Sequence, residues 1–372
     1  MKVVYVSGTR ADYGLMKGTL EKLRDKVDLT ILCTGMHLMD KFGYTVKDVI
    51  ADGFNVKKIG VTYNGDDHTD MSIFLGSCIT KISPVIADIG PDLILVLGDR
   101  SEMLAAALVG NYLGIPIIHI HGGEQTGTID DTIRHSISRL ASYHLCAAKG
   151  HANFLVHLGE PKDRIKVVGS PGLDSIYSSD YGSKELFLDK YQFGTKKTFL
   201  CVYHPVTKSS ELSDKLMQNL LSVLVDEDVE GIIVYPNADA GGRKMIETLN
   251  KFSDRFKIFE NLSRPDYLTA MKHVDVMVGN SSSALIEAPA LSTVAVNIGD
   301  RQIGRMQGDN IINCKTDKVS IKIAVKEALT GNKVMSGISP YGDGKAEERI
   351  TNIIMGLDLE AIKHKKLWYN NE

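Results

Sequence analysis

The stretch KVVYVSGTRADYG, residues 2–14, joins a short apolar run to a glycine-containing turn and a helix-like segment. Four more apolar runs follow in the first half, at residues 28–34, 92–98, 116–121 and 143–148, with helix-length segments between them. Continuous apolar runs that alternate with helices are typical of buried parallel strands in βαβ units. The pattern therefore predicts a doubly wound α/β domain.

The same alternation restarts after a polar segment, SIYSSDYGSKE at residues 175–185, which we interpret as an interdomain linker. Strand candidates in the second half occupy residues 198–204, 231–236, 256–260, 275–280 and 293–298. We expect a first domain of residues 1–174 and a second of residues 175–355, with ligand loops at the strands' carboxyl ends facing one cleft. Residues 356–372 are expected to form a tail that covers an exposed face or crosses back to the first domain.

Composition points to a small-molecule ligand. The chain has 372 residues, enough for about two domains, and its 43 Lys+Arg against 46 Asp+Glu give a net charge of -3. Without a long basic block, a surface for nucleic acid or an anionic membrane is not indicated. The five cysteines form no CxxC pair and are expected to be buried thiols in a reducing compartment. With no signal-like start and no segment near the ~18 apolar residues of a membrane span, we expect a cytoplasmic protein.

Two polar loops follow the first and third clear strands. GTRADYG, residues 8–14, opens a helix whose N-terminus, with Arg10, could hold a phosphate, although it lacks the GxGxxG and GxxxxGK[ST] patterns. LGDRSE, residues 97–102, places Asp99 at a strand end. Asp99 is either a helix N-cap, with Glu102 three residues later as in a capping box, or a functional group.

The loop HIHGGEQTGTIDD, residues 119–131, concentrates ionisable groups. His119 and His121 are two residues apart and are expected on one side of a strand, while the glycines at 122–123 allow close approach to the backbone. Glu124 and the Asp130-Asp131 pair follow, and one aspartate is expected to cap a helix. A His-x-His metal site is the rival interpretation, and an acid/base cluster with differently shifted pKa values is the favoured one.

Loops of the second half offer groups for a nucleotide. His204 follows one strand and Asn237 another, in YPNADAGG. In GNSSSALIEAPAL, residues 279–291, the serines from Ser281 stand where a helix would begin, which suits a diphosphate, and Glu287 could accept ribose hydroxyls. Arg301 could complete the neutralisation of phosphates without a metal.

These motifs, in order from Ser7 to Asn310, resemble the hydrolysing UDP-N-acetylglucosamine 2-epimerases, which make N-acetylmannosamine for sialic acid synthesis. The resemblance implies a GT-B fold of two Rossmann-like doubly wound domains facing a central cleft, with nucleotide held mainly by the second and sugar chemistry done by the first. It implies catalytic residues at Asp99, His121, Glu124, Asp130 and Asp131. It implies UDP-binding residues at Arg10, His204, Asn237, Ser281, Ser282, Glu287 and Arg301.

The resemblance also implies a reaction. UDP would leave by anti elimination across C1 and C2 to give 2-acetamidoglucal, and addition of water would give N-acetylmannosamine, with no metal and no cofactor. Non-hydrolysing relatives carry glutamate at the position of His121, so either His121 or Glu124 would be the C2 base. The alternatives are hydrolysing epimerisation of UDP- or GDP-linked N,N'-diacetylbacillosamine, for legionaminic acid, and a GT-B glycosyltransferase. Related epimerases imply a homodimer or homotetramer.

Overall fold

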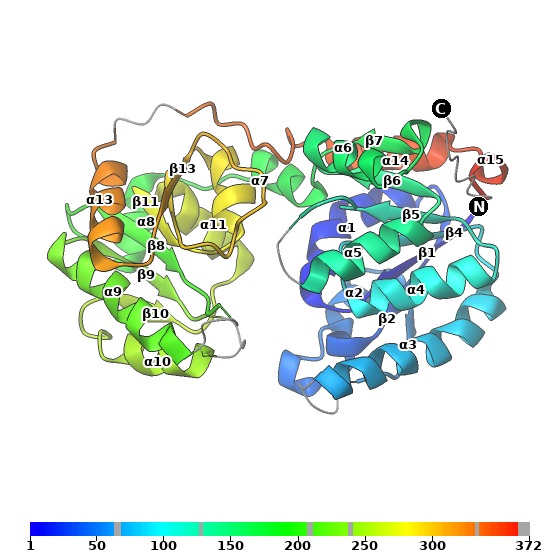
Figure 1. The fold of residues 1–372 in the computed structure, drawn as a ribbon, viewed down its shortest axis with the longest axis horizontal. Helices are drawn as coiled ribbons and strands as arrows, with labels where there is room; N and C mark the ends of the chain where they lie inside the picture. The colour runs from blue at the N-terminus through cyan, green and yellow to red at the C-terminus, as the bar shows by residue number, and fades with distance from the viewer. Residues whose placement is uncertain (63–67, 126–128, 207–210, 237–240, 332–334, 364–372) are drawn as a thin grey trace. The chain divides into compact units, whose positions relative to one another are not determined.

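The structure is a computed structural model that describes residues 1–62, 68–125, 129–206, 211–236, 241–331 and 335–363 (Figure 1). It divides into two compact units. The first unit contains Met1–Ser175 together with the residues from Gly344 onward, and the second contains Ile176–Asp343. Each unit is built around one parallel sheet, so the two units are described separately.

The first unit has a seven-stranded sheet in the order β3-β2-β1-β4-β5-β6-β7. The strands are β1 (Lys2–Ser7), β2 (Asp28–Cys33), β3 (Asn55–Lys58), β4 (Leu93–Leu97), β5 (Ile117–Ile120), β6 (Tyr143–Cys146) and β7 (Ile165–Val167). The helices are α1 (Arg10–Arg24), α2 (Val46–Ala51), α3 (His68–Ile89), α4 (Ser101–Tyr112), α5 (Ile129–Leu140), α6 (Lys149–His157), α14 (Ala346–Gly356) and α15 (Leu359–Lys363), with α7 (Asp174–Ser178) at the boundary. Every adjacent strand pair in this sheet is parallel.

Strand β1 shows why both faces of this sheet are covered. Its side chains alternate, so Val3 and Tyr5 join one buried cluster while Val4 and Val6 join another. The first cluster contains residues of α1 and α14, and the second contains residues of α3 and α4. Helices on both faces bury the apolar strands completely, which is the doubly wound arrangement that the sequence predicts.

The second unit has a six-stranded sheet in the order β10-β9-β8-β11-β12-β13, again with every adjacent pair parallel. The strands are β8 (Thr198–Val202), β9 (Glu230–Val234), β10 (Lys257–Phe259), β11 (Val276–Gly279), β12 (Ala295–Ile298) and β13 (Ile311–Cys314). The helices are α8 (Lys184–Tyr191), α9 (Ser213–Asp226), α10 (Gly242–Asn250), α11 (Arg264–His273), α12 (Ser283–Ile286) and α13 (Lys318–Leu329). The predicted α/β class with two doubly wound sheets is confirmed, while the cleft between them stays a prediction.

Residues 344–355 lie in the first unit, although the sequence pattern placed them in the second domain. Helix α14 contributes Ala346 and Ile350 to the core beside α1, and Asp174 accepts hydrogen bonds from the first two backbone N–H groups of α14. Further on, α15 buries Ile362 in the same core. The sequence pattern could not indicate which sheet would bury the apolar face of this helix.

Helix α3 corrects one expectation about membrane spans. Its residues Thr69–Ile89 are long and apolar enough to cross a membrane by length and composition, whereas no such segment was expected. A single helix of this kind is weak evidence for a membrane span, because the core helices of globular proteins meet the same criteria of length and composition. Four of its side chains, Phe74, Cys78, Ile82 and Ile86, are buried in the core of the first unit.

Gly279 ends β11 at a point where the chain cannot carry a side chain. Its φ is 143°, and a Cβ there would lie 2.1 Å from the carbonyl oxygen of Val202 on the neighbouring strand β8. Gly194, in contrast, would place a Cβ 3.7 Å from its nearest neighbour, with no positive φ. Close approach of the strands therefore requires glycine at position 279.

We predict that Gly279→Ala destabilises the second unit by at least about 3 kcal/mol, because it adds a backbone clash to a disfavoured φ. Gly194→Ala is the matched control and should change stability by less than about 1 kcal/mol. Amide hydrogen exchange, followed by mass spectrometry, measures the stability of peptides from β8 and β11. Equal protection in the two variants would contradict the prediction.

Candidate active site

Three of the predicted loops lie side by side in the first unit. They follow β1, β4 and β5, which are neighbours in the sheet, and all strands run parallel. The strand order reverses between β1 and β4, and the carboxyl ends on either side of such a reversal are where open α/β sheets bind ligands. The topology therefore assembles the motifs that the sequence placed at residues 8–14, 97–102 and 119–131.

Arg134 joins the polar groups of two of these loops. Its guanidinium forms an ion pair with Asp99, a second one with Glu124 at 3.3 Å, and a hydrogen bond to the carbonyl oxygen of His121 at 2.9 Å. The arginine is 3% exposed and Glu124 is 5% exposed. Two carboxylates from separate strand ends are thus held by one buried cation.

The sequence analysis missed Arg134, although the sequence contains a signal for it. Arg134 is on the buried face of α5, in the row that continues with Ile137, Ser138 and Ala141, each 0% exposed. A cation at an apolar-face position of an amphipathic helix needs a charged partner, because burying an unpaired charge is costly. That mismatch marks Arg134 as a residue with a specific role.

His119 and His121 were expected on one side of a strand, but the structure does not place them there. Strand β5 ends at Ile120, and His121 has a left-handed φ of 63°, so the alternation of side chains stops before it. The ring of His119 is fully buried, with Nε2 2.8 Å from the carbonyl oxygen of Gly98 and Nδ1 2.9 Å from Ser138 Oγ. Burial lowers the pKa of His119 well below its usual value, which fits a structural, neutral imidazole.

The glycines at 122–123 allow other groups to lie close to their backbone, as expected, and these groups are other residues of the protein. A Cβ on Gly122 would lie 2.9 Å from His119 Nδ1, and one on Gly123 would lie 2.3 Å from the carbonyl oxygen of His151 in α6. Gly123 also has a φ of 82°. These contacts bring the loop down onto α5 and α6, which positions Glu124 beside Arg134.

Asp130 and Asp131 are both in the first turn of α5, which begins at Ile129. Which of the two caps the helix stays a prediction, because the residues immediately before Ile129 lie outside the described part of the chain. Burial lowers the pKa of His135 below its usual value. The negative charge of Asp131, which is half-buried, acts in the opposite direction and partly offsets this shift. Within the described ranges, no group of three or more His, Cys, Asp or Glu side chains is placed to hold a metal ion.

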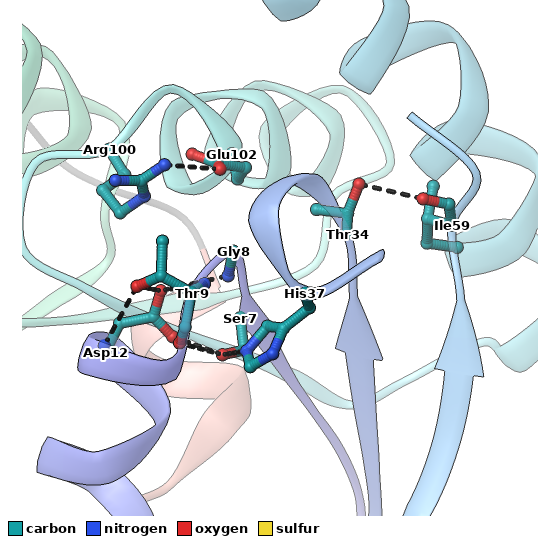
Figure 2. A network of polar contacts seen from close by, with 9 residues as sticks. All are labelled: Ser7, Gly8, Thr9, Asp12, Thr34, His37, Ile59, Arg100 and Glu102. Carbon is teal, nitrogen blue, oxygen red and sulfur yellow. Dashed lines mark hydrogen bonds and ion pairs between the residues drawn. The ribbon is translucent and has the colours of Figure 1, made fainter. Parts of the chain in front are cut away.

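Asp99 is not a helix cap. The N-cap of α4 is Arg100, and no side chain caps it, so the suggested capping box with Glu102 is wrong. Glu102 is instead 0% exposed and pairs with Arg100 at 2.9 Å (Figure 2). A Cβ on Gly8 would lie 2.4 Å from the carboxylate of Glu102, so this buried side chain occupies the space beside the first loop.

The backbone of the first loop is engaged by Asp12 (Figure 2). Its Oδ2 accepts hydrogen bonds from the N–H groups of Gly8 at 3.0 Å and Thr9 at 2.8 Å. Gly8 precedes α1 and Thr9 is its N-cap residue, so the phosphate site at the helix N-terminus with Arg10, which is exposed, stays a prediction. Asp12 also bonds to Ser7, whose hydroxyl lies 2.9 Å from His37 Nε2.

In the second unit, Asn280 ties together the ends of two strands. Its side-chain oxygen accepts from the N–H of His204 at 2.7 Å, and its amide donates to the carbonyl of His204 at 2.8 Å. The carbonyl oxygen of Asn280 accepts from Arg301 at 3.1 Å and from Gln302 at 2.7 Å. Two predicted UDP-binding residues, His204 and Arg301, are therefore held by one asparagine, while Asn237 lies outside the described residues.

The serine loop begins a shorter helix than the sequence indicated. Helix α12 has 4 residues, with Ser282 as its N-cap and no side-chain cap bond, so its macrodipole is small. Ser281 and Ser283 bond to each other through their hydroxyls at 2.9 Å. Glu287, just after the helix, forms an ion pair with Arg264 at 2.6 Å. A phosphate bound at this loop would therefore interact mainly with the serine hydroxyls, the backbone N–H groups of the loop and an arginine side chain.

Asp12 and His37 make opposite contributions to stability in acid. Burial raises the pKa of Asp12 from 3.8 to about 6, so the folded state binds this proton more tightly than the unfolded state does. The contribution of Asp12 to the free energy of unfolding therefore falls as pH rises from about 4 to 6. Burial lowers the pKa of His37 from 6.5 to about 4, so its contribution rises with pH between about 4 and 6.5. The two slopes therefore oppose each other in the wild type.

We predict that Asp12→Asn makes unfolding free energy increase more steeply with pH between about 4 and 6, since only the His37 slope remains. Urea titrations at several pH values in this window, followed by circular dichroism, measure that slope. Asp12→Asn/His37→Asn should restore a shallow dependence. An unchanged slope in Asp12→Asn would show that the two groups are not titrating against each other.

Removing the cation between Asp99 and Glu124 should destabilise the first unit. We expect Arg134→Met to cost about 3–5 kcal/mol, because it removes the buried cation that pairs with both carboxylates. Adding Glu124→Gln should recover part of the loss. Hydrogen exchange of β4 and β5 reports the effect, with Arg243→Met, which breaks a pair that is 95% exposed at the arginine, as control. Equal effects of Arg134→Met and Arg243→Met would refute the proposed pairing.

Comparison with known proteins identifies the family of this chain. The family model described as UDP-N-acetylglucosamine 2-epimerase matches residues 21–355. A relative from Legionella pneumophila, named UDP-N,N'-diacetylbacillosamine 2-epimerase (hydrolyzing), is 36% identical over 97% of both chains. One from Neisseria meningitidis, named UDP-N-acetylglucosamine 2-epimerase, is 34% identical over 89% of this chain and 88% of its own length.

Solved structures have the same fold. The crystal structure of UDP-GlcNAc 2-epimerase from Neisseria meningitidis, bound to UDP-GlcNAc, aligns with a TM-score of 0.80 and 18% identity, covering 95% of this chain and 100% of that one. At this identity the likeness supports the fold alone. The family match spans most of the sequence and includes both units. The chain therefore belongs to the UDP-N-acetylglucosamine 2-epimerase family.

Proposed function

We propose that this protein is a hydrolysing 2-epimerase that releases UDP and a free 2-acetamido sugar from a UDP-linked substrate. The observation that supports it best is the pairing of Asp99 and Glu124 through buried Arg134 at the adjacent carboxyl ends of β4 and β5. A reaction that removes one proton and delivers another needs acid and base groups fixed close together. Membership in the epimerase family supports the same conclusion.

The proposed chemistry begins with removal of the C2 proton by Glu124 or His121. The C1–O bond to UDP breaks, the C2–H electron pair forms the C1–C2 double bond, and UDP leaves with the bonding electrons to oxygen. Water then adds through its oxygen to C1 while a proton is delivered to C2 on the opposite face from the one removed. Asp99 and one of Asp130 and Asp131 are proposed to supply that proton and to activate the water.

UDP binding is proposed to use loops of the second unit. In the second unit, Ser281, Ser282 and Arg301 would contact the diphosphate and Glu287 the ribose. Among the residues that the structure describes, Glu287 Oε2 is buried without a hydrogen-bond partner, which supports a role in accepting a ligand hydroxyl. Arg10, His204 and Asn237 remain predicted UDP contacts.

Two sugars are candidates for the substrate. UDP-N-acetylglucosamine, which would give N-acetylmannosamine, is supported by the family and by the relative named for it. UDP-N,N'-diacetylbacillosamine is supported by the 36% identical relative named for that substrate. The two differ at C4 and C6 of the sugar, away from the C1 and C2 atoms at which the chemistry takes place. The proposed mechanism therefore applies to either substrate. The homodimer or homotetramer stays a prediction.

The test is a proton NMR time course in D2O with a metal chelator, without acceptor, on each nucleotide sugar in turn. We expect UDP and a free 2-epimeric sugar deuterated at C2 from one of them. Intact substrates in both tubes would refute hydrolytic epimerisation, and turnover that needs an added acceptor would favour a glycosyltransferase. The sugar consumed faster identifies the substrate.

Variants assign the roles in the same assay. Replacement of the C2 base, tested by His121→Asn and Glu124→Gln, should slow UDP release about 10²–10⁴-fold. Replacement of the group that activates water, tested by Asp99→Asn, Asp130→Asn and Asp131→Asn, should release UDP but accumulate the 2-acetamidoglucal. Asp88→Asn, at an exposed position of α3, is the control. Wild-type rates in all five variants would contradict the proposed site.

A further inference from the structure

Two side chains of α11 contact the loop that follows β11. Arg264 Nη2 lies 2.6 Å from Glu287 Oε1, and Tyr267 Oη lies 2.6 Å from Ser283 Oγ. The two residues are three positions apart and therefore on the same face of the helix. One helix face thus supports both the carboxylate and the serines of the proposed nucleotide site.

The position of Arg264 is unusual for an arginine. It is the first residue of α11, where the partial positive charge of the helix end disfavours a cation. Its ion pair with Glu287 accounts for the placement. The pair uses Oε1, whereas Oε2 is buried and, within the described part of the chain, has no hydrogen-bond partner. Arg264 therefore fixes the carboxylate with one oxygen still able to accept a hydroxyl.

Tyr267 begins a chain of hydroxyl groups. Ser283 Oγ lies between Tyr267 Oη and Ser281 Oγ, which is 2.9 Å away, and the N–H of Ser283 donates to Ser281 Oγ at 3.4 Å. Burial raises the pKa of Tyr267 well above its usual value, so its phenol remains protonated. If Tyr267 donates its proton to Ser283, Ser283 can donate its own proton to Ser281, and the Ser281 hydroxyl proton is then available for an anion.

We infer that Arg264 and Tyr267 are positioning residues for a nucleoside diphosphate in the second unit. Arg264 orients Glu287 so that Oε2 accepts a ribose hydroxyl, and Tyr267 orients Ser283 and Ser281 toward a phosphate. Neither residue contacts the nucleotide itself. The inference rests on the proposed function, because it assumes that this loop binds UDP, and it adds the residues that determine selectivity for ribose.

Calorimetric titration with UDP and with 2′,3′-dideoxy-UDP, in the presence of EDTA, tests the two roles separately. We expect the wild type to prefer UDP by about 10-fold or more, as for a hydrogen bond to a charged group. Arg264→Gln should reduce the preference to about threefold or less, and Arg264→Lys should give an intermediate value. Tyr267→Phe should weaken both ligands in parallel by about 3- to 10-fold and leave the preference unchanged.

Two control variants match the chemistry of the substitutions. Arg255→Gln breaks an arginine–aspartate pair with Asp228, which precedes β9 at the amino edge of the sheet. Tyr191→Phe removes a buried phenol for which the described structure shows no hydrogen-bond partner. Both should bind the two ligands like the wild type. Circular dichroism identifies a variant that fails to fold, and Arg264→Lys then carries the test.

The outcomes separate this inference from the proposed function. A wild type that binds no UDP overturns both. If the wild type binds UDP but Arg264→Gln keeps the full ribose preference, or the wild type shows no such preference, the role of Arg264 is overturned while the proposed function stands. Unchanged affinities in Tyr267→Phe overturn the role of Tyr267 in the same way.

Discussion

Parallel pairing of the strands is the constraint on which the rest of this structure depends. Every adjacent pair in both sheets is parallel, so each strand must be followed by a connection that returns the chain to the same edge. The carboxyl ends of β1, β4 and β5 consequently meet, as do those of β8 and β11. Residues as far apart in the chain as His204 and Asn280, which are 76 positions apart, become neighbours because of this topology.

Arginine–carboxylate pairs then determine how the polar side chains lie within each unit. Arg134 holds Asp99 and Glu124, Arg100 holds the fully buried Glu102, and Arg264 holds Glu287. A carboxylate that leaves water needs a cation or several donors to offset its desolvation. Each pair therefore stabilises a loop conformation and at the same time orients an acidic group. Asp99, Glu124 and Glu287 lie on loops, whereas their partners Arg134 and Arg264 come from helices α5 and α11.

Local sequence reasoning failed where a residue's environment came from elsewhere in the chain. His121 was expected to continue a strand, but its backbone is left-handed. Arg134 donates to its carbonyl oxygen, and the carbonyl oxygen of Leu145 accepts from its N–H. The helix pattern at residues 8–14 also did not indicate that the Asp12 carboxylate accepts hydrogen bonds from the N–H groups of Gly8 and Thr9. In each case the partner lies in a different element or the bond is invisible to periodicity. Helix α14 joined the first unit for the same reason.

Hydrophobic periodicity and turn residues are properties of neighbouring positions, so the amino-acid sequence alone predicted the doubly wound α/β class, the loops that carry the polar motifs and the strands other than the edge strands β3, β7 and β13. It also contained the family resemblance in its ordered motifs. Only the tertiary structure decided which charged groups pair, that Arg134 and Asn280 tie separate loops together, and which sheet buries the final helices. Those outcomes depend on distances between residues far apart in the chain, and such distances exist only once the sheets have formed.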